Sequence, residues 1–309
     1  MYNNISTTWS KMANVNTFGD PTQSYVNSSN IANNAIVLDA DKKDFNESLL
    51  PFSSHPLWND CTEEVKSTVL SHAWILYNRK TVFVECDIVT PTCEILLKKP
   101  PVELHRSDLQ TCISEALLDE ALHTKMSVAA CNLIADFRCL DKIQYPDFKL
   151  IRDLNNMLST VNSGWERNLI RLTAACVSET LITDYLSLLS NDTSIQKVCQ
   201  DVTNAHAADE LLHSSLFSQL MCDLLQTLTL LEKKVVTKTI PIIAKLFADN
   251  ELVVWREVLH HCNVQSLNVI IEDVANSKQE TINVEGVDRF LSRCGIDPDS
   301  LDVPDLVGL

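Results

Sequence analysis

The stretch NAHAADELLH, residues 204–213, places two histidines and a glutamate in a segment that is rich in Ala and Leu. His206, Glu210 and His213 stand four and three residues apart, which is the spacing of one face of an α-helix. Because the surrounding residues are mostly apolar, we expect this face to point into a core. Buried imidazoles and carboxylates need partners, so the rest of the chain has to supply them.

A weak internal repeat supplies the partners. LLDEALH (117–123) and AADELLH (207–213) share the pattern D-E-x-x-H. Each copy follows, by about thirty residues, a glutamate in an apolar segment: Glu85 in TVFVECDIV and Glu179 in AACVSETLI. The chain therefore repeats a glutamate followed by Glu-x-x-His.

This spacing suits a pair of metal ions inside a helical bundle. Glu and His at positions i and i+3 share a helix face, so both can reach one ion. Two such helices and a glutamate from each of two more form the carboxylate site of di-iron and di-manganese bundle proteins. Oxygen and imidazole ligands suit Fe²⁺, and the central Glu120 and Glu210 are expected to bridge two ions. The alternative, glutamates on solvated helix faces, does not explain the doubled motif in apolar segments. The predicted ligands are Glu85, Glu120, His123, Glu179, His206, Glu210 and His213.

His206 and two aspartates add detail to this predicted site. His206 lies one turn before Glu210, and we expect it to reach the ion held by Glu179 and His213. Asp119 and Asp209 each precede a bridging glutamate. If the two long helices pack antiparallel, Asp119 would orient His213 and Asp209 would orient His123. The alternative is that each Asp pairs with a basic side chain or faces solvent.

Composition limits the partners and the compartment. The chain has 309 residues, 45% of them hydrophobic, and a formal net charge of −16. Such an acidic protein is not expected to bind nucleic acid or an anionic membrane. No secretory leader and no apolar run of membrane-spanning length is evident. Eleven cysteines without a C-x-x-C motif favour reduced thiols in the cytoplasm.

The pattern along the chain predicts an all-α fold. With only 5 glycines, long segments are free of helix breakers. Residues 1–45 are polar and are expected to form an arm, either mobile or packed on the surface, before a single domain over 46–309. Pro91 is expected to end or bend a short second helix. The predicted helices are 62–77, a short one containing TVFVECDIVTP, 109–137, 148–162, 165–190, 194–226, 231–248, 251–260, 265–276 and 286–294.

The segments ECDIVTP, DEALH and HAADELLH resemble, in order and spacing, the ligand-bearing segments of the p-aminobenzoate N-oxygenase (AurF-like) di-iron enzymes. The resemblance covers about residues 60–300, and His206 is its most specific part. It implies a ferritin-like helical bundle with additional C-terminal helices, two iron ions, O₂ as co-substrate and an external electron donor. It also implies oxidation of the amine nitrogen of a small specialised metabolite to a hydroxylamine, nitroso or nitro group, and a possible homodimer.

The resemblance also implies a division of the ligands between the two ions. One iron would take Glu85, Glu120 and His123, with Glu210 bridging. The other would take Glu179, His206, Glu210 and His213, with Glu120 bridging.

Substrate contacts are less clearly marked in the sequence. Tyr185, nearly two turns after Glu179, is a candidate to line a cavity, although core packing is its more ordinary role. Arg289 or Arg293 could face a substrate carboxylate, although solvated surface arginine is the simpler interpretation. His72 and His105 are expected at the surface or at helix caps.

Other functions remain compatible with the same cluster. A di-iron oxidase acting on C–H or C–C bonds would need the same ligands, because the pocket decides which bond reacts. A non-catalytic iron-binding bundle would need no substrate cavity. A metal-free helical interaction module does not explain the doubled motif.

Overall fold

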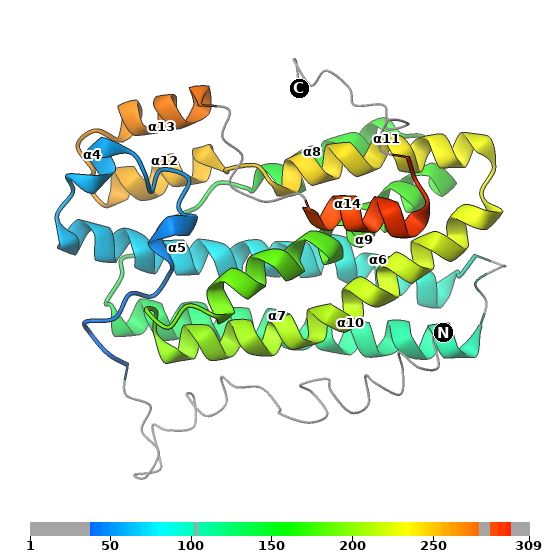
Figure 1. Ribbon diagram of the computed structural model, residues 1–309, viewed down its shortest axis with the longest axis horizontal. Coiled ribbons are helices and arrows are strands. Elements are labelled where there is room, and N and C mark those ends of the chain that lie inside the picture. The colour runs from blue at the N-terminus through cyan, green and yellow to red at the C-terminus, as the bar shows by residue number, and fades with distance from the viewer. Residues whose placement is uncertain (1–37, 102–103, 105, 278–284, 298–309) are drawn as a thin grey trace, which may run out of the picture.

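The computed structural model describes residues 38–101, 104, 106–277 and 285–297, and helices dominate them (Figure 1). No strand occurs in these ranges, so the predicted all-α class is confirmed. The elements are η2 (Glu47–Leu49), α4 (Pro56–Asn59), α5 (Glu63–Val84), η3 (Glu85–Val89), α6 (Thr90–Lys98), α7 (Ser107–Phe137), α8 (Lys149–Thr160), α9 (Gly164–Ser190), α10 (Lys197–Thr227), α11 (Leu230–Phe247), α12 (Leu252–His261), α13 (Leu267–Asn276) and α14 (Glu285–Cys294).

One continuous helical rod replaces the first two predicted helices. α5 continues past Tyr77, and the π-helical turn η3 joins it directly to α6. Pro91 lies in the first turn of α6 and does not end a helix, so that part of the expectation was wrong. The reason is local: Thr90 N donates to Glu85 O, an i to i+5 bond that widens the backbone just before the proline.

Four long segments form the bundle that surrounds the site. The rod of α5, η3 and α6 packs on α7, α9 packs on α10, and α10 also contacts α7. In Figure 1, α7 and α10 lie side by side and run in opposite directions. The antiparallel arrangement brings the two D-E-x-x-H motifs face to face.

α9 is a long apolar helix of the bundle. By length and composition it could cross a membrane, which corrects the expectation that no segment would. Most of it is buried against α10 and α11, and a helix that is apolar all round is typical of the interior of a large bundle.

The additional C-terminal helices cover the bundle. α11 packs along α9 and α8, α12 packs on α13 and α5, and α14 crosses α9 and α10 (Figure 1). α11 begins with a capping box, in which Thr229 Oγ1 accepts from Glu232 N and the Glu232 side chain accepts from Thr229 N. The structure is therefore a helical bundle with additional C-terminal helices, as the family resemblance implied.

The described end of the polar arm is fastened to the bundle. Arg138 makes two contacts with the buried Asp44, from Nε to Oδ2 at 2.9 Å and from Nη2 to Oδ1 at 3.1 Å. Lys43 O accepts from Gln196 N at 2.8 Å. Residues 1–37 lie outside the described residues, so an arm over 1–45 and a domain over 46–309 stay predictions.

His72 does not lie at the surface, as expected, but inside the helical layer. Its side chain is buried on α5, and Nδ1 lies 2.9 Å from the Tyr145 hydroxyl. α12 covers this part of α5 and places the His261 ring 5.6 Å from the His72 ring. Burial and His261 lower the pKa of His72 to about 4. His105 lies outside the described residues.

Candidate metal centre

Four elements carry the predicted ligands into the bundle. Glu85 opens the π-helical turn η3, α7 supplies one Glu-His pair, α9 supplies Glu179, and α10 supplies the remaining three residues. All of these side chains are buried. The set is Glu85, Glu120, His123, Glu179, His206, Glu210 and His213.

The seven side chains converge into overlapping groups. Within each group, one potential ligand atom per residue lies within 4.8 Å of every other. Among the described residues, the groups are Glu85 with His123, His206 and Glu210; Glu120 with His123, Glu210 and His213; and Glu85 with Glu120 and Glu179.

Glu120 and Glu210 lie between two histidines. His213 Nδ1 is 3.0 Å from Glu120 Oε1 and 3.3 Å from Glu210 Oε1. His123 Nδ1 is 3.2 Å from Glu120 Oε2 and 3.4 Å from Glu210 Oε1. Each of these carboxylates therefore contacts both imidazoles, which is the position that a bridging ligand requires. Glu179 Oε2 lies 3.2 Å from His213 Nδ1, on one side of the pair.

His206 contacts two of the glutamates. Its Nε2 is 3.0 Å from Glu210 Oε1 and 3.5 Å from Glu85 Oε1, and its ring centroid is 4.0 Å from that of His123. The sequence grouped His206 with Glu179 and His213, and the ion that it would hold stays a prediction. His213 Nδ1 contacts the same oxygen, Glu210 Oε1, at 3.3 Å, so the two imidazoles meet at this carboxylate.

Of the two predicted crossed contacts, the one between Asp209 and His123 has the distance of a hydrogen bond, and the one between Asp119 and His213 has the distance of an ion pair. Asp209 Oδ2 lies 3.2 Å from His123 Nε2, and Asp119 Oδ2 lies 3.5 Å from His213 Nε2. All four side chains are fully buried. A carboxylate at Nε2 holds the proton there and leaves Nδ1 directed at the glutamates.

The glutamates have strongly unequal proton affinities. Burial and the neighbouring carboxylates raise the pKa of Glu85 and Glu179 well above the usual value. Although burial alone would raise it, the nearby His213 lowers the pKa of Glu120 to about 2, and that of Glu210 is lowered in the same way. The four buried glutamates therefore have too little positive charge around them to balance their own negative charge.

The histidines differ too. Against the effect of burial, Asp209 and Glu120 raise the pKa of His123 to about 10. Burial and the neighbouring His123 instead lower the pKa of His206. His206 is therefore neutral at pH 7 and able to donate a lone pair to a cation.

Several buried carboxylate oxygens are suited to bind a cation. Both oxygens of Glu85, and Oε2 of Glu179 and of Glu210, are buried and make no hydrogen bond in the described part of the chain. Buried polar atoms are nearly always bonded, and exceptions ask for an explanation such as an ion. The donor set of carboxylate and imidazole fits divalent iron or manganese.

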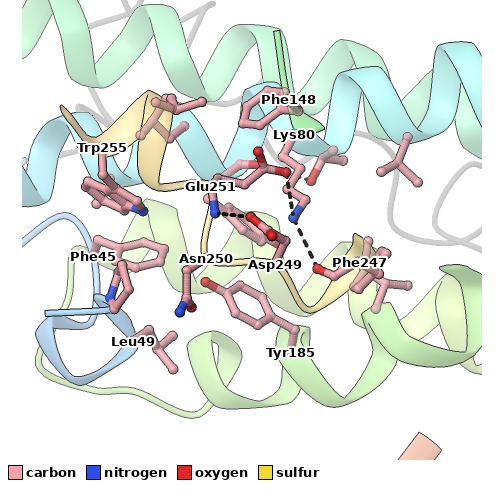
Figure 2. A pocket seen from close by; sticks show the side chains of 18 residues that line it. Phe45, Leu49, Lys80, Phe148, Tyr185, Phe247, Asp249, Asn250, Glu251 and Trp255 are labelled. Carbon is pink, nitrogen blue, oxygen red and sulfur yellow. Dashed lines mark hydrogen bonds and ion pairs between the residues drawn. The ribbon is translucent and has the colours of Figure 1, made fainter. Parts of the chain in front are cut away.

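A cavity of about 120 Å³ is lined by residues within one helical turn of Glu85 and Glu179, and none of the seven predicted ligands lines it. Thr81 and Val84 line it just before Glu85 on the same rod, and Ile182 lines it one turn after Glu179. Tyr185 lines it too, as the sequence suggested (Figure 2). Its ring stacks on that of Tyr77, with ring centroids 5.6 Å apart.

Tyr77 links the cavity to the carboxylates. Its hydroxyl is buried without a hydrogen bond among the described residues. Burial, Tyr185, Glu210 and Glu85 raise its pKa well above the usual value, so the hydroxyl keeps its proton. Sequence reasoning missed Tyr77, although Tyr77, Thr81 and Glu85 are four residues apart on one helix face.

The basic residue that lines the cavity is Lys80, not Arg289 or Arg293. Arg289 and Arg293 lie exposed on α14, whose buried face is formed by Val287, Phe290 and Leu291. Neither arginine lines the cavity, and Lys80 does so instead. Lys80 stands five residues before Glu85, so its place on the ligand helix was readable from the sequence.

Comparisons with known proteins agree with this site. A family model described as p-aminobenzoate N-oxygenase AurF matches residues 31–295. The 4-aminobenzoate N-oxygenase of Streptomyces thioluteus is 24% identical over 263 residues, which cover 84% of this chain and 78% of that protein.

Proposed function

The chain belongs to the p-aminobenzoate N-oxygenase AurF family, and we propose that it is a di-iron, O₂-dependent oxygenase that oxidises the nitrogen of a small amine. The observation that carries this proposal is the buried cluster of four glutamates and three histidines beside a cavity. The oxidised product would be a hydroxylamine, nitroso or nitro compound.

Charge balance supports two divalent ions at the cluster. Four buried carboxylates without cations would be very costly, and two Fe²⁺ ions would neutralise them. Glu85, His123 and His206 would hold one ion, and Glu179 and His213 the other, with Glu120 and Glu210 between them. When bound and reduced, the two irons would supply electrons to activate O₂.

The protein's own groups would arrange the reactants. Asp209 and Asp119 would keep the Nε2 proton on His123 and His213, so that Nδ1 serves as the ligand atom. The apolar walls of the cavity would exclude water and hold the hydrocarbon part of the amine. The protonated hydroxyl of Tyr77 is placed to orient a polar group of the substrate by a hydrogen bond.

Other parts of the proposal rest on the family or on general chemistry. Reducing the irons requires an external electron donor, and a homodimer is expected from the family alone. The eleven cysteines carry reduced thiols, which supports a reducing, cytoplasmic location. An oxidase of C–H or C–C bonds would use the same cluster, and the family match favours nitrogen as the target. A non-catalytic iron-binding bundle does not account for the cavity beside the glutamates.

The test is direct detection of the oxidised amine. Iron-loaded protein is chemically reduced, mixed with ¹⁸O₂ and a panel of aromatic amines, and analysed by mass spectrometry. We expect at least one amine to gain labelled oxygen, and Glu120→Ala to form none. If wild-type protein carrying two irons oxidises no amine but modifies a C–H bond, the oxidase alternative replaces this proposal.

A further inference from the structure

The cavity contains a cation that is already paired. Lys80 Nζ lies 3.5 Å from Glu251 Oε1 and donates to Phe247 O at 3.2 Å (Figure 2). The side chains of Lys80 and Glu251 are 21% and 9% exposed, so solvent screens this pair weakly. Among the described residues that line the cavity, Lys80 is the only cation, whereas Asp249 and Glu251 are acidic.

The loop between α11 and α12 holds Glu251 in this position. Glu251 has a φ of 51°, in the left-handed region that side chains other than glycine seldom adopt. Its Oε2 accepts from Lys149 N at 2.7 Å, and its own backbone N donates to Asp249 Oδ1 at 2.8 Å. Lys149 Nζ in turn donates to Asp249 Oδ2 at 2.9 Å. The second acid therefore has its own cation, and Glu251 remains opposite Lys80.

This arrangement is unfavourable for a carboxylate in the substrate. A carboxylate that recruits Lys80 would leave Glu251 in the cavity wall without its cation, and would place two negative groups side by side. An uncharged ring meets no such cost, because aromatic and aliphatic side chains form most of the wall. These side chains are Phe45, Leu49, Leu76, Phe148, Ile182, Phe247, Val254 and Trp255.

We propose that the Lys80–Glu251 pair makes this cavity selective for small aromatic amines that carry no carboxylate. The proposal rests on the N-oxygenase function, because it assumes that the cavity receives the amine. Glu251 acts as a specificity-determining residue: it compensates the charge of Lys80, so the cavity rejects anionic amines. The cavity volume of about 120 Å³ suits a single-ring compound.

Two probes of nearly the same shape test this charge selection. 4-Aminobenzoate is anionic at pH 7, and 4-aminobenzamide is its neutral counterpart. Binding of each to the purified protein is measured by anaerobic calorimetry, where no turnover occurs. We expect wild-type protein to bind the amide about tenfold tighter or more, because like charges oppose the carboxylate. Equal or tighter binding of 4-aminobenzoate overturns the proposal, as does binding of neither compound.

A charge-neutralising variant assigns the effect to Glu251. Glu251→Gln keeps the shape and releases Lys80, so 4-aminobenzoate should gain about tenfold or more in affinity relative to the amide. Glu257→Gln, the same change at an exposed position of α12, should leave the ratio unchanged. An unaltered ratio in a folded Glu251→Gln protein, judged by circular dichroism, contradicts the assignment. The wild-type comparison decides the selectivity even if this variant does not fold.

Turnover separates this proposal from the function on which it rests. With iron, reductant and O₂, kcat/KM for the two probes should follow the same preference as their affinities. Selective binding without any oxidised amine would overturn the N-oxygenase function and leave the charge selection standing. Oxidation that favours 4-aminobenzoate would overturn the charge selection and leave the N-oxygenase function standing.

Discussion

Replacing Asp209 by Asn should weaken one of the two iron sites more than the other. Asp209 Oδ2 lies 3.2 Å from His123 Nε2 in a fully buried contact, so its charge fixes the proton that leaves Nδ1 free for the ion. Loss of such a partner lowers metal affinity by about 10- to 100-fold. This corresponds to about 1.4–2.7 kcal/mol of binding free energy.

The two Asp–His contacts differ in length, so the two Asn substitutions should differ in their effect on iron affinity. Asp119 Oδ2 lies farther from its histidine, at 3.5 Å from His213 Nε2, so Asp119→Asn should have the smaller effect. His123 belongs both to the group with Glu85 and His206 and to the group with Glu120, Glu210 and His213. In the proposed division of the ligands it holds one ion with Glu85 and His206, so Asp209→Asn should weaken the ion on that side. At iron concentrations that give two ions per chain in the wild type, we expect this variant to retain close to one.

Anaerobic competition against an iron chelator measures both affinities. Asp201→Asn, the same substitution on α10 at a residue that pairs with Lys197, is the matched control and should bind iron like the wild type. Full retention of both ions by Asp209→Asn at every chelator concentration would refute an orienting role for this contact. An equal loss of both ions would refute the assignment of His123 to one side.

Three further predictions follow from other buried contacts. His206→Ala should fold but keep its Glu85-side iron about 10-fold less tightly or worse, measured by the same chelator assay; wild-type affinity would make His206 a packing residue. Arg138→Met leaves Asp44 buried without its cation and should reduce the free energy of unfolding in urea by about 3–5 kcal/mol; a loss below 1 kcal/mol would contradict this. The lowered pKa of His72, about 4 against an ordinary 6.5, means that the unfolded chain binds more protons between these pH values. Stability should therefore fall as the pH decreases through that window, by up to about 3 kcal/mol, and His72→Gln should flatten the dependence.

Much of the site was predictable because the helical period fixes it. Once 107–137 and 197–227 are helices, the D-E-x-x-H spacing places each Glu and His on one face and each Asp beside them. The antiparallel packing of these helices then produces the crossed contacts of Asp119 and Asp209.

Other features depend on tertiary structure and carry no local signal. The π-helical turn at Glu85 depends on i to i+5 hydrogen bonding, such as that from Thr90 N to Glu85 O, and no residue pattern in the sequence predicts it. Glu251 reaches the cavity from a loop, through a left-handed backbone that the α11–α12 connection imposes. Burial of His72 depends on α12, which is distant in sequence and packs over α5.

The iron content of the folded protein shows directly whether the buried cluster holds two irons. Wild-type protein and Glu120→Ala are loaded with Fe²⁺ without O₂, freed of unbound iron by gel filtration, and analysed for iron per folded chain. We predict close to two irons for the wild type and a clear loss for Glu120→Ala, whose carboxylate contacts both His123 and His213. Folded wild-type protein that retains no more iron than the variant would contradict the account.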